Sequence, residues 1–157
     1  MQRQRLLVRT VLPLLALFLF MSWGATVSPV RAQDKTEKSL YERLGGYDAV
    51  AAVCDEFIKR LAADKQLSRF LVGLSDDSKK RLRQHLVNQF CAATGGPCVY
   101  TGRDMKTVHT GLGISESEWE TGAKHLVDTL DKFKVPKKEK DEVIAFVSGL
   151  KKDIVEK

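Results

Sequence analysis

Apolar side chains recur at helical spacing along nearly all of the chain after residue 39, and this periodicity constrains the fold most. The clearest run is Val50, Val53, Cys54, Phe57 and Leu61. Side chains three or four residues apart share one face of a helix, whereas a half-buried strand needs alternation with a period of two. No segment alternates in that way for long enough to be a strand. The sequence therefore predicts an all-α domain without internal repeats.

Glycine, proline and capping residues divide this pattern into about five substantial helices. Serine accepts hydrogen bonds from the free amides of a first helical turn, and glycine adopts the positive φ that ends a helix. Residues 98–114 are punctuated by glycine and leave room for only a turn or two of helix, around Met105 to Thr110. The expected boundaries are Gly45-Gly46, Ser75 to Ser78, Thr94 to Pro97, the capping box Ser115 to Glu118, and Pro136 at the first position of a last helix that includes Val143 and Ile154.

Residues 1–32 have the features of a secretory signal: a basic start, the apolar run Val11 to Met21, and small residues before Ala32. An uncleaved anchor is the alternative, since the uncharged residues 10–30 are long enough to span a bilayer. Pro13 and Pro29 favour cleavage after Ala32. Both interpretations place the domain outside the cytoplasm, and we expect a bacterial periplasm, with membrane contact only through an uncleaved segment. We expect residues 33–38 to form a linker and residues 39–157 the folded domain.

Much of the positive charge lies in this leader. The chain has 26 Lys and Arg against 20 Asp and Glu, but four of the arginines lie in residues 1–32 with no acid, so the remainder carries only +2. A nucleic-acid-binding surface needs a basic stripe and usually stacking aromatic residues. The mixed charges of the body have neither property, so we expect no nucleic-acid partner.

The cysteines leave two interpretations open. Cys91 and Cys98 flank Gly95-Gly96-Pro97, a turn that could bring their sulfurs together in an oxidising compartment. Alternatively, Cys91 is a small apolar residue buried in the core. We favour the unbridged interpretation, because a disulfide requires a Cα separation that the sequence does not supply.

The three histidines differ in their surroundings. His109 lies in the irregular segment between glycine-rich breaks, from which a ring can turn toward a pocket as a metal ligand does. A solvated loop residue is the commoner role for such a lone histidine. His85 shares a helix face with Leu82 and Leu86, which is more typical of a core residue than of a ligand. His125 lies on a long amphipathic helix, where we expect it to pack or face solvent.

Several motifs occur together and in order. They are Ser39-Leu40-Tyr41-Glu42-Arg43-Leu44-Gly45-Gly46, Gly95-Gly96-Pro97, the run from Tyr100 to His109 with its MxxxH step, Gly111-Leu112-Gly113-Ile114, and Val135-Pro136. With these motifs the chain resembles the group 1 truncated haemoglobins over about Leu40 to Val155. The resemblance implies a shortened globin fold, in which two helices stack over two others with haem b between them.

The resemblance also implies roles for residues around the haem. His109 matches the proximal ligand of the iron. His85 is either a distal polar group that binds the iron as a sixth ligand, or a group that turns outward to a haem propionate. Tyr100, Arg103 and Lys106 lie where they can meet the propionates, with a solvated surface role as the alternative.

The distal side departs from many members of that family. Ile58 follows Phe57 where many members have tyrosine, and Leu82 and Leu86 stand where they have glutamines. We therefore expect the pocket around Phe57, Leu82 and Leu86 to offer few hydrogen bonds to bound oxygen. This weakens the case for tight oxygen binding and for efficient oxidation of nitric oxide.

Three functions remain open at this point. The leading hypothesis is an exported haem protein that binds oxygen, nitric oxide or carbon monoxide, or passes electrons to or from a reductase of unknown identity. A haem enzyme that oxidises nitric oxide or reduces peroxide is the alternative. The third is a haem-free helical interaction module, in which the histidines only pack.

Overall fold

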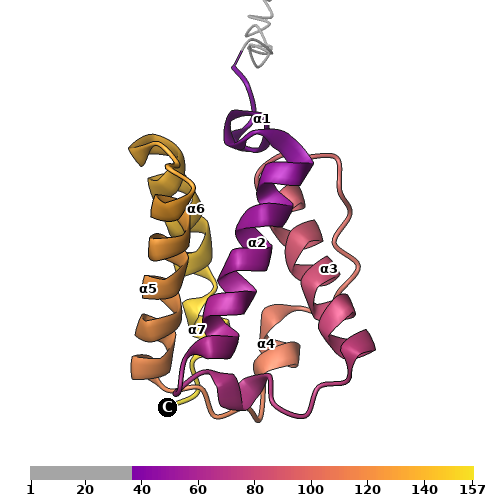
Figure 1. Cartoon of the computed structure of the whole chain (residues 1–157), viewed down its shortest axis with the longest axis vertical. Helices are drawn as coiled ribbons and strands as arrows, with labels where there is room; N and C mark the ends of the chain where they lie inside the picture. The colour runs from indigo at the N-terminus through magenta and orange to yellow at the C-terminus, as the bar shows by residue number, and fades with distance from the viewer. Residues whose placement is uncertain (1–36) are drawn as a thin grey trace, which may run out of the picture. The chain divides into compact units, whose positions relative to one another are not determined.

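The long helices expected from the sequence are present in the computed structural model, which describes residues 37–157 (Figure 1). Within that range no strand is present, and no helix combines the length and apolar character needed to cross a membrane. The predicted signal peptide, residues 1–32, lies outside the described residues. The helices are α1 (Leu40–Leu44), α2 (Gly46–Ala63), the 3-10 turn η1 (Ser68–Phe70), α3 (Asp76–Ala93), α4 (Met105–His109), α5 (Glu116–Lys132), α6 (Lys137–Gly149) and α7 (Lys151–Ile154).

Capping side chains set the helix starts as predicted. The Ser75 hydroxyl accepts from the Ser78 amide at the start of α3. At the start of α5, Ser115 and Glu118 form a complete capping box, in which each side chain bonds the backbone amide of the other residue. These contacts satisfy amides that the first turn of a helix leaves without an intrahelical partner.

The C-terminal end differs from the prediction. Pro136 precedes α6 as its N-cap instead of being its first residue, and the expected single last helix divides into α6 and α7. At the division the Leu150 amide donates to Val147 and Ser148. Gly149 is the last residue of α6, and glycine is a weak helix former, so the chain tightens there and turns.

Two helical pairs form the body of the domain. α2 packs against both α3 and α5, and α5 also packs against α6, so α2 and α3 form one layer and α5 and α6 the other (Figure 1). The core between them contains Val87, Leu126, Leu130 and Val143, each at most 1% exposed. The short helix α4 lies outside this core and packs against α7. This arrangement leaves space between α3, α4 and α5.

Cys91 and Cys98 are joined in a disulfide with a Cα–Cα distance of 5.7 Å, which corrects our preference for a free Cys91. The turn between the two cysteines lies close to Tyr41 and Cys91. A Cβ on Gly96 would lie 2.6 Å from the Tyr41 ring and 2.7 Å from the Cys91 sulfur. Only glycine allows that approach. Cys54 is a free thiol and is buried.

Candidate functional site

A cavity of about 810 Å³ occupies the space between the two helical layers and α4. Its walls come from α2, η1, α3, α4, α5 and the C-terminal helices, and they are predominantly apolar. Such a large apolar cavity with few polar groups is typical of a cofactor or ligand site. The residues that the sequence placed around the haem line it, with the exception of Lys106: Phe57, Ile58, Leu82, His85, Leu86, Tyr100, Arg103 and His109.

His109 is the last residue of α4 and half-buried at the cavity. Its Nδ1 lies 2.7 Å from the backbone oxygen of Met105. Because that carbonyl can only accept, Nδ1 carries the proton and donates it, which leaves the Nε2 lone pair free. A ring oriented through Nδ1 in this way is the usual arrangement of a metal-ligating histidine.

The local sequence explains why α4 begins where it does. The Asp104 carboxylate accepts from the Thr107 amide at 2.9 Å and from the Thr107 hydroxyl at 2.6 Å. These hydrogen bonds lower the pKa of Asp104, so the cap remains charged. The cap starts a turn of helix in an otherwise irregular segment, and His109 then falls on the turn that faces the cavity.

His85 lines the cavity from α3. Its ring packs edge-on against Tyr100, with the ring centroids 6.1 Å apart. Its Nδ1 is buried and has no hydrogen-bond partner within residues 37–157. A buried polar nitrogen without a partner is costly, so this position is suited to a bound group that supplies one.

The remaining distal positions are apolar, as expected. Ile58, Leu82 and Leu86 all line the cavity and contribute no donor. Gln89, one turn further along the same face of α3, also lines it, although no role at the site was predicted for it. Its side-chain amide lies 3.2 Å from the Met105 sulfur, so it links α3 to α4. Helical spacing from Leu82 and Leu86 is the signal that identifies this residue.

Tyr100 and Arg103 lie at the cavity, whereas Lys106 is exposed and is not among the lining residues. The Tyr100 hydroxyl donates to the Arg103 backbone oxygen at 2.7 Å. Burial, and the nearby negative charge of Asp104, raise the pKa of Tyr100. A Cβ on Gly102 would clash with the Tyr100 ring and hydroxyl, so the ring position depends on that glycine.

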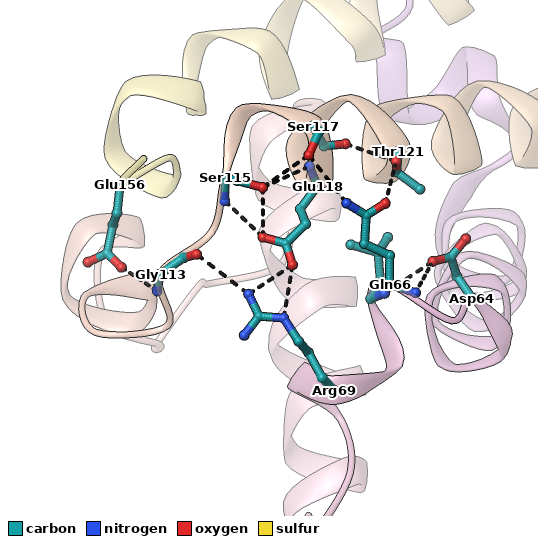
Figure 2. Close-up of polar contacts among 10 residues, drawn as sticks. Asp64, Gln66, Arg69, Gly113, Ser115, Ser117, Glu118, Thr121 and Glu156 are labelled. Atoms are coloured by element: carbon teal, nitrogen blue, oxygen red, sulfur yellow. Dashed lines mark hydrogen bonds and ion pairs between the residues drawn. The ribbon is translucent and has the colours of Figure 1, made fainter.

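Glu118 is a buried acid in the cavity wall, 7% exposed, which bonds both the N-cap of its own helix and η1 (Figure 2). It accepts from the Ser115 amide at 2.9 Å and forms an ion pair with Arg69 of η1 at 2.8 Å. The amide of Ser115, followed by Arg69, lowers the pKa of Glu118. The capping-box motif predicts the contact with Ser115, but no sequence motif predicts the ion pair with Arg69.

His125 lies apart from the cavity lining. Its Nε2 lies 3.0 Å from the Asp64 carboxylate, which also accepts from the Gln66 and Leu67 amides. It therefore packs between α5 and the end of α2, which is one of the two positions expected for it, packed or facing solvent.

A two-layered helical domain whose apolar cavity presents one imidazole with a free nitrogen, and a second with an unpartnered one, has the features of a haem-binding globin. The lining suits haem, because the macrocycle is largely apolar and its iron needs a nitrogen ligand.

Comparison with known proteins also identifies a globin. The chain belongs to the bacterial-like globin family, whose family model matches residues 39–156. A group 1 truncated haemoglobin of Mycolicibacterium paratuberculosis is 39% identical over 116 residues, which cover 74% of this chain and 83% of that protein. A group 1 truncated haemoglobin of Nostoc commune is 38% identical over 88 residues, covering 56% and 72%.

Solved structures give the same fold. The 2/2 haemoglobin of a Synechococcus species superposes with a TM-score of 0.65 at 30% identity, covering 71% of this chain and 91% of that one. The truncated haemoglobin of Tetrahymena pyriformis superposes with a TM-score of 0.69 at 24% identity, covering 76% of this chain and 100% of that one. The resemblance to group 1 truncated haemoglobins, the two-over-two fold and haem b as the family's cofactor are confirmed.

Proposed function

We propose that this chain is an exported haem protein that binds a diatomic gas, with His109 as the proximal ligand of the iron. The observation that carries the proposal is the His109 ring, which lies at the cavity with Nδ1 bound to the Met105 oxygen and Nε2 free. When bound, haem supplies an iron that can take up a small gas molecule and change oxidation state.

The other residues of the cavity define the surroundings of that iron. Phe57, Ile58, Leu82 and Leu86 exclude water and give no hydrogen bond to a ligand. The Met105 carbonyl accepts a hydrogen bond from Nδ1 of His109 and so holds the orientation of the ring. The affinity of the iron for a gas therefore depends chiefly on apolar packing around the gas and on one further polar group.

We infer that His85 is this polar group. The unpartnered, buried Nδ1 supports the inference, as does the absence of donors at the three distal positions beside it. Tyr100 packs against the ring and limits its movement. A His85 that binds the iron must leave before a gas can enter, which slows gas binding.

Replacement of single histidines tests both assignments. His109→Ala should lose haem and its intense Soret absorption, whereas His125→Ala, a histidine outside the cavity, should keep both. His109→Ala with a normal haem content and an unchanged spectrum would contradict the proximal assignment. A wild-type chain that binds no haem at all would instead support the interaction module.

His85 is tested on the haem-loaded protein. A low-spin spectrum without added ligand that becomes high-spin in His85→Ala, together with faster carbon monoxide binding, supports iron ligation. The Leu86→Ala variant controls for a change in cavity volume alone. Spectra and binding rates that are the same in wild type and His85→Ala would contradict a role of His85 in binding the iron or the gas.

The export of the domain is also a proposal. It is supported by the signal-like features of residues 1–32 and by the Cys91–Cys98 disulfide, since such bonds persist in oxidising compartments outside the cytosol. The intact mass of the protein recovered from the periplasm tests it. A mass that starts at Gln33 supports cleavage after Ala32, and the mass of all 157 residues would favour an uncleaved anchor instead.

A further inference from the structure

The segment that follows His109 is held by the C-terminal end of the chain. Gly111 and Gly113 have positive φ values of 87° and 62°, so this segment is a turn and does not continue α4. Their backbone amides both donate to Glu156: the Gly111 amide to Oε1 at 2.7 Å and the Gly113 amide to Oε2. One carboxylate thus bridges two amides that come two and four residues after His109.

The backbone around Glu156 is tied to the same segment. The Glu156 amide donates to the Ile114 oxygen at 2.8 Å, and the Glu116 amide donates to the Lys157 oxygen at 3.0 Å. These backbone bonds fix the direction from which the Glu156 side chain approaches Gly111 and Gly113. They therefore help the two glycine amides to order the carboxylate. The amides of Gly111 and Gly113 lower the pKa of Glu156, as expected for a carboxylate that accepts backbone hydrogen bonds.

Gly113 is also held from its other side (Figure 2). The Arg69 guanidinium lies 3.5 Å from the Gly113 oxygen while it pairs with Glu118 at the start of α5. The glycine is thus bonded through its amide to the C-terminal segment and through its oxygen to η1. Movement of this segment would break contacts on two separate elements.

Helix α4 is unable to hold His109 in place by itself. It has five residues, and a helix of that length has too few internal hydrogen bonds to be stable without its surroundings. Asp104 fixes its first turn, and the segment after His109 must fix its last. The Thr110 amide and hydroxyl close that last turn on the Lys106 oxygen, at 2.9 and 2.6 Å, and Glu156 then holds the segment that follows it.

We propose that Glu156 is a positioning residue for His109, which acts through the amides of Gly111 and Gly113 and sets the orientation of the imidazole toward the iron. This rests on the proposed role of His109 as proximal ligand. Outer partners that orient a metal ligand commonly change metal affinity by about 10- to 100-fold when they are removed. Glu156 acts through the backbone, so we expect an effect at the lower end of that range.

A graded series in the haem-loaded, full-length protein tests the proposal. Glu156→Gln keeps a single carbonyl oxygen and so loses one of the two hydrogen bonds, whereas Glu156→Ala loses both. Asp153→Asn is the matched control, since it removes a charge from the same end of the chain and Asp153 accepts no side-chain hydrogen bond among residues 37–157. Three quantities are compared: amide exchange at Gly111 and Gly113, the iron–histidine stretching frequency of the ferrous protein, and the rate of haem transfer to apomyoglobin.

We expect exchange at both glycines to accelerate, the stretching frequency to shift, and haem loss to become about tenfold faster in Glu156→Ala. Glu156→Gln should lie between that variant and wild type, and Asp153→Asn should match wild type. A stretching frequency that is unchanged in Glu156→Ala overturns the proposal, even if the glycine amides exchange faster.

The His109→Ala variant separates this outcome from a failure of the proposed function. If that variant keeps its haem and its spectrum, the ligand assignment itself is wrong. If His109→Ala loses haem and Glu156→Ala behaves as wild type, only the positioning role is wrong.

Discussion

Loss of the Cys91–Cys98 disulfide should lower the stability of the folded domain by a predictable amount. The bridge joins residues separated by 7 positions. In the chain-entropy description, closing so short a loop restricts the unfolded chain by about 2.5 kcal/mol. For a domain of about 120 residues, that corresponds to a decrease of roughly 10 °C in the midpoint of thermal unfolding.

The native turn does not depend on the bridge. The Gly96 amide donates to the Cys91 oxygen at 2.8 Å, and the Thr94 hydroxyl donates to the Phe90 oxygen at 2.7 Å. These bonds remain when the sulfur of Cys98 is replaced by an oxygen. The loss should therefore arise from the unfolded chain, with little change in the folded structure.

Cys98→Ser is the variant to measure, and Val99→Ser is its control, because Val99 is adjacent and 72% exposed. Thermal unfolding is followed by circular dichroism on oxidised proteins with the same haem content, since bound haem itself adds stability. We expect the full decrease in Cys98→Ser and almost none in Val99→Ser. Equal midpoints for the two variants would refute the reasoning.

Three further outcomes are expected. Hydrogen bonds from His125 and from the Gln66 and Leu67 amides lower the pKa of Asp64, so its contribution to stability is present above the ordinary value of 3.8 and is lost as the pH falls below it; the difference in unfolding midpoint between wild type and Asp64→Asn should therefore shrink between about pH 5 and pH 3. Burial raises the pKa of Cys54 to about 12, so a thiol reagent at neutral pH should label it only after unfolding, and rapid labelling of the native protein would contradict this. Ile58→Tyr would place a hydroxyl at the cavity, and a new hydrogen bond of about 1 kcal/mol should slow oxygen dissociation about fivefold in stopped-flow measurements, with Ile58→Phe as the control without a hydroxyl.

The starts of the capped helices and the identity of the main ligand candidate followed from the sequence because both depend on local signals. Ser75, Asp104 and Ser115 start their helices through hydrogen bonds to amides three residues later, and such contacts need no tertiary structure. His109 stood out because glycines interrupt the chain on both sides of it. Its likeness to a known motif then assigned it a role.

The pairing of the cysteines required the tertiary structure. The sequence showed a turn that could close, but not the Cα separation that decides whether it does. In the folded chain Gly96 packs against the Tyr41 ring, and this contact brings Cys98 back to the end of α3. Packing against Tyr41 of α1, in addition to the turn itself, therefore places Cys98 close enough to Cys91 to form the disulfide.

Polar contacts around the cavity also depended on the fold. Glu118 meets Arg69 across 49 positions of sequence, and Glu156 meets Gly111 across 45. A charged side chain on a predicted helix has no defined partner until the packing of helices fixes which surfaces meet and at what offset. The sequence alone thus determined most of the helices and the main ligand candidate, His109, whereas only the tertiary structure decided which distant groups bond the segment that follows it.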